Sequence, residues 1–168
     1  AGADMDQVKI DGVSQNPILY LWNPSPRPLF IEQLLKNGSD ANYADRNGNT
    51  LLMYASGYEP QKYGFLPGKG NYSSADYAEL FLRYDADVSQ QNKEGWTALD
   101  YAVQLDDDMA AMNLLLSYGA EVTPVVLSHA LDFEGAYTHY QRIHKLVALL
   151  DSSQTSTILT PIFDAAIR

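Results

Sequence analysis

The 168-residue sequence contains no cysteine, which excludes disulfide bonds, thiolate nucleophiles and thiolate metal ligands. Basic residues are scarce: 11 Lys and Arg stand against 21 Asp and Glu, and the formal net charge is −10. Nucleic-acid binding requires a basic surface, so we expect no nucleic-acid partner. No apolar run approaches the length of a membrane-spanning helix. The acidity is explained either by solubility or by a basic partner.

What the sequence does contain is repetition. Residues 48–55 (GNTLLMYA) are echoed by residues 95–102 (GWTALDYA), and each segment has Thr, Leu and Ala two, four and seven positions after its first Gly. A second pattern occurs three times, as residues 34–42 (LLKNGSDAN), 80–88 (LFLRYDADV) and 114–122 (LLLSYGAEV). A unit of this size cannot bury its apolar face alone, so we expect roughly three or more stacked units.

These motifs resemble the ankyrin repeat, in which a helix opened by Thr is followed by a second helix ending in Leu-Leu-x-x-Gly. Thr50 and Thr97 are suited to cap the first helices. The positions of Gly38, Asp85 and Gly119 favour left-handed backbone after the second helices. The resemblance implies an all-α ankyrin-repeat solenoid of about four helix pairs with short hairpin turns, spanning residues 1–168 as one domain.

One unit is longer than the others. The step from Gly48 to Gly95 exceeds the ankyrin period of about 33 residues, and the excess falls between Ser56 and Asp76. Gly, Pro, Asn and Ser dominate residues 57–75, which forbids a long helix there. We therefore predict an inserted loop at about 57–75, between the two helices of one unit.

The two ends depart from the pattern, and we interpret residues 1–28 and 124–168 as degenerate caps. At the first end, residues 29–36 are predicted to be a second helix whose partner is the apolar run 17–22. At the other end, we expect a helix from Pro124 to about 131 and a loop over 132–137. A helix over 140–150 and a terminal cap at 158–168 complete this prediction.

Chemistry-bearing residues form no recognisable motif. His129, His139 and His144 are interpreted as surface or loop histidines, with a metal site or an active site as the alternative. Asp45–Asn49 suggests a calcium loop only faintly, because the required Gly and closing Glu are missing, and an ankyrin turn explains it better. Asp106–Asp108 offers three carboxylates without other ligands, and we assign it to a helix start. We expect no catalytic residue, no cofactor and no bound metal.

The resemblance places a binding surface on the hairpin tips and on the groove beside them. Asn49 and Trp96, between the Gly and the Thr of each motif, are expected to be exposed to the groove. For Trp96, packing on the neighbouring turn is an equal alternative to a binding hot spot. The tips themselves carry Arg46, Asn47, Lys93 and Glu94.

The inserted loop carries four aromatic residues: Tyr58, Tyr63, Phe65 and Tyr72. They can form a self-packed Ω-loop, or a contact patch for a partner, because Tyr provides rigid contact area at low entropic cost. We favour the contact patch.

The resemblance implies a non-catalytic protein-binding module. Small stand-alone ankyrin proteins of bacteria include immunity proteins, so we expect an inhibitor that blocks a toxin or effector enzyme with a basic surface, and a periplasmic location, with the cytoplasm as the alternative. An adaptor for a stress or signalling enzyme is the second hypothesis. A metal-binding or enzymatic protein that uses its histidines is the third.

Overall fold

The computed structural model describes residues 8–10, 13–15, 18, 28–57, 72–104, 109–131 and 136–150. The elements in these ranges are the strands β1 (Val8–Ile10) and β2 (Val13–Gln15) and the helices α2 (Pro28–Lys36), α3 (Leu51–Ala55), α4 (Ser74–Leu82), α5 (Ala98–Ala102), α6 (Ala110–Ser117), α7 (Pro124–Leu131) and α8 (Ala136–Leu149). No described helix is both long and apolar enough to cross a bilayer.

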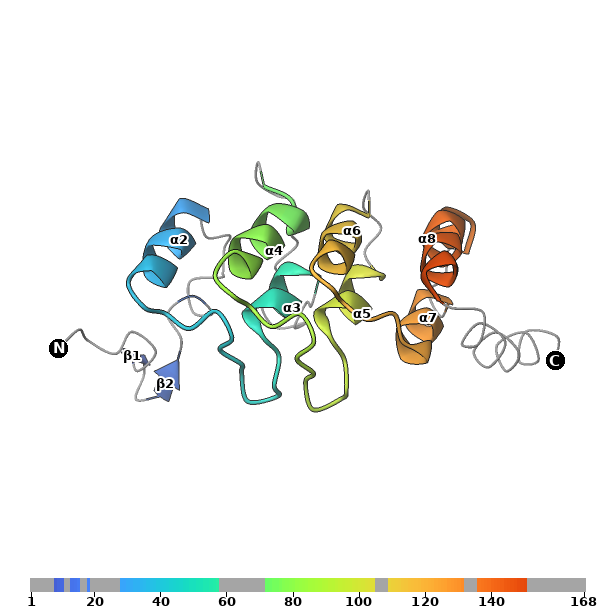
Figure 1. Cartoon of the computed structure of the whole chain (residues 1–168). Helices are drawn as coiled ribbons and strands as arrows, with labels where there is room; N and C mark the ends of the chain where they lie inside the picture. The colour runs from blue at the N-terminus through green and yellow to red at the C-terminus, as the bar shows by residue number, and fades with distance from the viewer. Residues whose placement is uncertain are drawn as a thin grey trace.

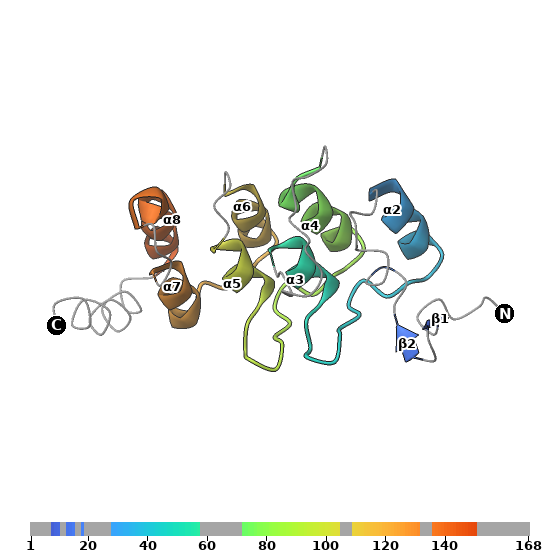
Figure 2. The same cartoon turned by 180° about the vertical axis from the view of Figure 1, so that it is seen from behind.

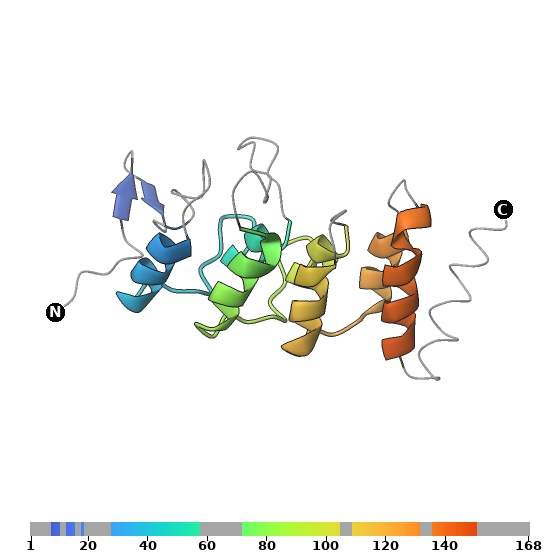
Figure 3. The same ribbon diagram turned by 90° about the horizontal axis from the view of Figure 1, so that it is seen from above.

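The helices stand in a row of pairs, each packed against the next (Figure 1). Within the pairs, α3 packs on α4, α5 on α6 and α7 on α8; between pairs, α4 contacts α6 while α3 and α7 both contact α5. The outer layer of α2, α4, α6 and α8 is best followed in Figure 3, and the view from behind in Figure 2 shows α3, α5 and α7 as the second layer. This is the expected helical stack, and three of its pairs are described.

The predicted first pair is described only in part. Its second helix is α2, which packs against α4. Of the predicted partner at 17–22 only Ile18 is described, and it is helical and fully buried.

The helical stack agrees with the all-α expectation, with one unpredicted addition at the N-terminal end: β1 and β2 form an antiparallel hairpin with Ile10 opposite Val13. Apolar and polar residues alternate in β1, and the intervening Asp-Gly dipeptide is a strong hairpin signal. The hairpin was therefore visible in the sequence.

The core runs through the stack without interruption. Every residue of α3 is buried, because this short helix lies between α4 and α5. The inward Leu99 of α5 is 0% exposed, and large buried side chains from α4, α6, α7 and α8 belong to the same core: Phe81, Met112, Leu115, Leu127 and Leu146. Burial of the repeated Leu and Ala positions thus holds the row together.

The predicted helix ends are confirmed in position, although only one of the two Thr side chains caps as expected: Thr97 is the N-cap residue of α5, but its side chain accepts no capping hydrogen bond. The Thr50 hydroxyl accepts a hydrogen bond from the Met53 amide (3.2 Å) and caps α3. After the second helices, Gly38, Asp85 and Gly119 all have positive φ, with Asp85 at 61°. Asp tolerates this conformation because its short polar side chain can bond locally.

Some predicted boundaries shift. α7 spans the predicted residues, but α8 begins at Ala136, so the expected loop is wrong at 136 and 137. α4 begins at Ser74, two residues inside the predicted excursion, because Ser73 and Asp76 form a capping box. The rest of the inserted loop (58–71), Asp106–Asp108 and the cap at 158–168 lie outside the described residues.

Two hairpins project from the helical layers, which we call the first finger (residues 40–50) and the second finger (residues 87–97) (Figure 1). Each tip is closed in the same way: the Asp45 amide donates to Asn49 C=O and the Asn92 amide to Trp96 C=O, both at 2.9 Å. At the base of the second finger the Ser89 hydroxyl donates to the Asp87 carboxylate (2.6 Å) and lowers the pKa of Asp87.

The fingers lie edge to edge and are joined by polar bonds. The Lys93 amide donates to Asn47 C=O (2.9 Å), and the Asn92 side chain donates to Asn49 Oδ1 (2.8 Å). Nearer the helices, the Asn42 side chain donates to Asp85 C=O (3.0 Å) and accepts from the Asp87 amide (2.6 Å). These bonds fix the distance between neighbouring units.

A third finger is missing before α7. Thr50 follows Gly38 by twelve residues and Thr97 follows Asp85 by twelve, but Thr123 follows Gly119 by only four. Thr123 still begins α7, since its hydroxyl accepts from the Val126 amide (3.2 Å). The connection from α6 to α7 is therefore too short to form a hairpin, and the second finger is the last.

We predict that Leu99→Ala lowers the free energy of unfolding by roughly 2–5 kcal/mol, because it opens a cavity at a fully buried position. Urea denaturation monitored by circular dichroism measures this loss. A loss below about 1 kcal/mol would contradict the assignment of Leu99 to the inter-helix core.

We also predict unequal costs at two equivalent glycines. Gly48 and Gly95 have φ of 83° and 81°, so alanine at either pays about 1–2 kcal/mol of left-handed strain. A Cβ on Gly48 would also lie 3.1 Å from Asn92 Cα, whereas one on Gly95 meets nothing within 4 Å. Gly48→Ala should therefore cost about 1–3 kcal/mol more than Gly95→Ala, the range for overpacking.

Thermal or urea unfolding of the two variants makes the comparison, and each serves as the control for the other. Equal losses would mean that the fingers are not packed edge to edge.

Candidate interaction site

The first finger is organised by one carboxylate. Asp45 Oδ1 accepts from the amides of Asn47 and Asn49 (both 2.8 Å), and Asp45 Oδ2 accepts from the Tyr54 hydroxyl (2.9 Å). The Asn49 side-chain amide also donates to both oxygens. The carboxylate thus accepts hydrogen bonds from its own finger and from Tyr54 of the following helix α3, which supports a structural turn here rather than a calcium loop.

The second finger has Asn92 at the equivalent position, where an amide replaces the carboxylate and adds a hydrogen-bond donor. Asn92 Oδ1 accepts from the amides of Glu94 and Trp96 (both 3.0 Å), as Asp45 does in the first finger. Asn92 Nδ2 adds what a carboxylate cannot, by donating to Asn49 Oδ1 and to the Tyr101 hydroxyl (both 2.8 Å). One amide therefore closes its own turn and holds the neighbouring finger.

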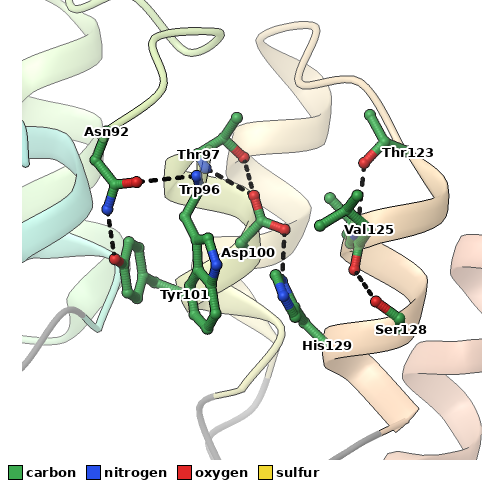
Figure 4. A network of polar contacts seen from close by, with 10 residues as sticks. Asn92, Trp96, Thr97, Asp100, Tyr101, Thr123, Val125, Ser128 and His129 are labelled. Atoms are coloured by element: carbon green, nitrogen blue, oxygen red, sulfur yellow. Dashed lines mark hydrogen bonds and ion pairs between the residues drawn. The ribbon is translucent and has the colours of Figure 1, made fainter. Parts of the chain in front are cut away.

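Trp96 lies at the base of the second finger between two rings (Figure 4). Its ring centroid is 5.0 Å from that of Tyr101 and 4.0 Å from that of His129 on α7. These distances are typical of favourable aromatic contacts. Trp96 is half-buried: its ring packs on residues of α5 and α7 and not on a neighbouring turn, and part of it stays at the surface.

Asp100 fixes the far side of this group of residues, which we call the Trp96 cluster and define as Trp96, Asp100, Tyr101 and His129. One carboxylate oxygen accepts from the amide and the hydroxyl of Thr97 (both 2.7 Å), and the other lies 2.9 Å from His129 Nδ1 (Figure 4). Asp100 is 2% exposed. Because an ionised carboxylate only accepts, Nδ1 is the donor, and the pair becomes an ion pair when the imidazole is protonated.

His129 was predicted to be a surface or loop histidine, and that prediction is wrong. It belongs to helix α7, its side chain is 14% exposed, and both its ring face and its Nδ1 are engaged. His144 is exposed on α8, and His139 is described only as part of that helix. The ranges that the structure describes contain no group of three or more potential metal ligands.

The other predicted contact residues fall into three groups. Asn49 is 1% exposed because the second finger covers it, so its expected exposure to the groove is wrong. Exposed positions on the finger tips are held by Arg46, Asn47, Lys93 and Glu94. Tyr72 is 39% exposed at the start of α4, while Tyr58, Tyr63 and Phe65 lie outside the described residues.

Two members of the Trp96 cluster, Asp100 and Tyr101, were not predicted from the sequence as site residues. Thr97 followed three residues later by Asp100 is a capping-box signature, which could have placed the carboxylate beside the finger. Tyr54 and Tyr101 occupy the same position in the two repeats, a signal that could have indicated a shared role at the turn. The partner His129 carried no comparable signal, since it comes from the next helix pair.

We predict that Asp100 and His129 are energetically coupled. In a double-mutant cycle of Asp100→Ala and His129→Ala, the coupling free energy should be about 0.5–1.5 kcal/mol, the net contribution of a typical hydrogen bond to stability. Urea unfolding of the two single variants and the double variant measures it. Additive losses would show that the 2.9 Å contact contributes nothing to stability.

The repeat geometry agrees with a comparison against known families. Residues 94–125, from the tip of the second finger through α5 and α6 to the start of α7, match the family model of the ankyrin repeat. No curated protein matches the chain at a significant level. The ankyrin repeat is a protein-interaction module, and the matched segment contains Trp96 and Asp100. The helix pair, the finger and this match together identify residues 94–125 as an ankyrin repeat.

Proposed function

We propose that this protein binds another protein through the tips of its two fingers and the Trp96 cluster, and that it does so as an inhibitor. The observation that carries the proposal is the state of Trp96. Its ring is stacked against Tyr101 and His129 but only half-buried, so a large amphipathic side chain is held in one orientation at the surface. Such preorganised aromatic residues are typical binding anchors, because little side-chain entropy is lost on contact.

The charge of the chain indicates the class of partner. The formal net charge is −10, and Glu94 is exposed on the second finger beside Trp96. Acidic surfaces accelerate encounter with basic proteins and disfavour acidic ones. A basic partner surface is therefore the best complement.

Within this class, an immunity protein that blocks a toxin or effector enzyme fits a small acidic binder best. The mechanism would be steric: the fingers cover the entrance to the partner's active site and exclude substrate. An inhibitor of a toxin delivered to the periplasm would act there, and we propose that location. An adaptor for a stress or signalling enzyme would bind without changing the activity of its partner.

We predict that Trp96→Ala weakens partner binding by at least about 1–2 kcal/mol while the fold is retained, as removal of a hot spot does. The partner is first captured from the source cell with tagged wild-type protein and identified by mass spectrometry. Calorimetric titration then compares wild type, Trp96→Ala and Phe30→Ala. Phe30 is a matched control, because it is an aromatic residue that is 49% exposed on α2 at the other end of the row.

A loss confined to Trp96→Ala supports the proposed surface, and a loop variant with Tyr63 and Phe65 changed to Ser tests the inserted loop in the same assay. Unchanged affinity in both would move the interface elsewhere. Inhibition of the partner's activity supports an inhibitor, whereas binding with unchanged activity supports an adaptor. Stoichiometric zinc in the purified protein would instead favour the metal-binding alternative.

A further inference from the structure

The second finger has one covered side and one open side. Its covered side faces the first finger and is paired through the Lys93 amide and the Asn92 side chain. Its other side faces the place that a third finger would occupy, next to the start of α7 (Figure 1). We call this the open side and define it by Glu94, Gly95 and Trp96 of the finger and Val125 and His129 of α7.

The covered junction shows what a neighbouring finger contributes. The second finger donates the Lys93 amide to Asn47 C=O. Its backbone also lies 3.1 Å from the position that a Cβ on Gly48 would occupy. It also buries Asn49 to 1% exposure. The residues one repeat later, at the equivalent positions, are Glu94, Gly95 and Trp96.

None of these three contacts is made on the open side. Within the described residues, no donor reaches Glu94 C=O. A Cβ on Gly95 would meet nothing within 4 Å, and Trp96 stays half-buried. Beside them, Val125 on the first turn of α7 is 48% exposed. The open side is therefore a backbone acceptor flanked by an aromatic ring and an exposed aliphatic side chain.

We propose that a protruding turn of a basic partner protein docks on the open side and takes the place of the missing third finger. Its backbone N–H would donate to Glu94 C=O, and its apolar surface would cover Trp96 and Val125. This inference rests on the proposed protein-binding function and specifies the part of the partner that is bound.

The charges favour a turn that carries Lys or Arg. Glu94 is exposed on the finger, and Glu121 is exposed on the connection that leads to α7. Lys93 is exposed too, but it is not one of the residues that define the open side. The remaining carboxylate nearby, Asp100, is buried and already bonded to Thr97 and His129. The accessible charge on the open side is thus negative.

A second copy of this chain is a poor occupant, although its first finger has the right shape. That finger lies in the chain between α2 and α3. If it were seated where the third finger would be, its own α2 and α3 would fall on α6 and α7. Only a turn that projects alone from its protein avoids this clash.

The test uses two cyclic peptides as probes. The first copies the tip sequence Asp-Arg-Asn-Gly-Asn of residues 45–49, which supplies both a free turn amide and a basic side chain. The second has Glu in place of the Arg. Each is titrated into the full chain, and nuclear magnetic resonance follows the Gly95 amide and the Trp96 indole N–H.

We expect the basic peptide to shift both signals and to bind about two- to fivefold more tightly than the acidic peptide, the range for one exposed ion pair. Glu94→Lys should reverse that preference, while Glu79→Lys, an exposed charge reversal on α4, should not. Gly95→Asn should abolish the shift of the Trp96 indole N–H, since Asn accepts a positive φ and its side chain fills the open space. Thermal unfolding verifies that each variant folds.

Absent shifts, or equal binding of both peptides, would overturn the inference. Titrations with the captured partner distinguish a failure of the proposed function from a failure of docking on the open side. If Trp96→Ala weakens binding but Glu94→Lys and Gly95→Asn do not, the protein-binding function stands and docking on the open side is wrong. If none of the three variants weakens binding, docking on the open side is wrong, and so is the proposed surface around Trp96, because the partner then binds elsewhere.

Discussion

The side-chain amide of Asn92 is the contact on which the arrangement of the fingers depends. Its oxygen closes the tip of the second finger, and its nitrogen joins that tip to Asn49 and to Tyr101. A carboxylate could close the turn, as Asp45 does in the first finger, but it could not donate across the junction. The choice between Asp and Asn at one motif position therefore decides whether a finger merely folds or also holds the finger before it.

The same logic explains why equivalent residues have different environments. Asn49 and Trp96 occupy the same place in their repeats, yet one is buried and the other is half-buried. Asn49 is covered because the next unit of the stack begins with a finger. The unit after that of Trp96 has no finger, because Thr123 follows Gly119 by only four residues. Exposure at this position is thus set by the length of the next connection and not by the residue itself. A shortened connection converts a structural position into a surface position.

Much of the fold could be predicted from the sequence, because the repeated residues carry local physical requirements. Thr50 at a helix start and positive φ at Asp85 follow from capping and backbone sterics, and both are found. The pairing of His129 with Asp100 could not be predicted, since the two residues lie 29 positions apart on different helix pairs. The burial of Asn49 was also missed, because it depends on the register of two fingers. Local rules place the elements, and contacts between repeats decide which side chains remain accessible.

The last helix pair is held to the stack in a different way from the others. Where the first finger meets the second, backbone and Asn amides join the units; where α5 and α6 meet α7 and α8, no finger is available. Three side chains of the last pair bridge that junction: His129 to Asp100, Arg142 to Val103 C=O (3.2 Å) and Lys145 to Asn113 (2.5 Å). All three carry a basic group, and two of them are directed at uncharged oxygens. Because His129 is both one of these bridges and the ring on which Trp96 stacks, the contact that secures α7 also orients the side chain that we propose as the anchor for a partner. Stability of the last helix pair and geometry of the proposed binding surface are thereby coupled through a single imidazole.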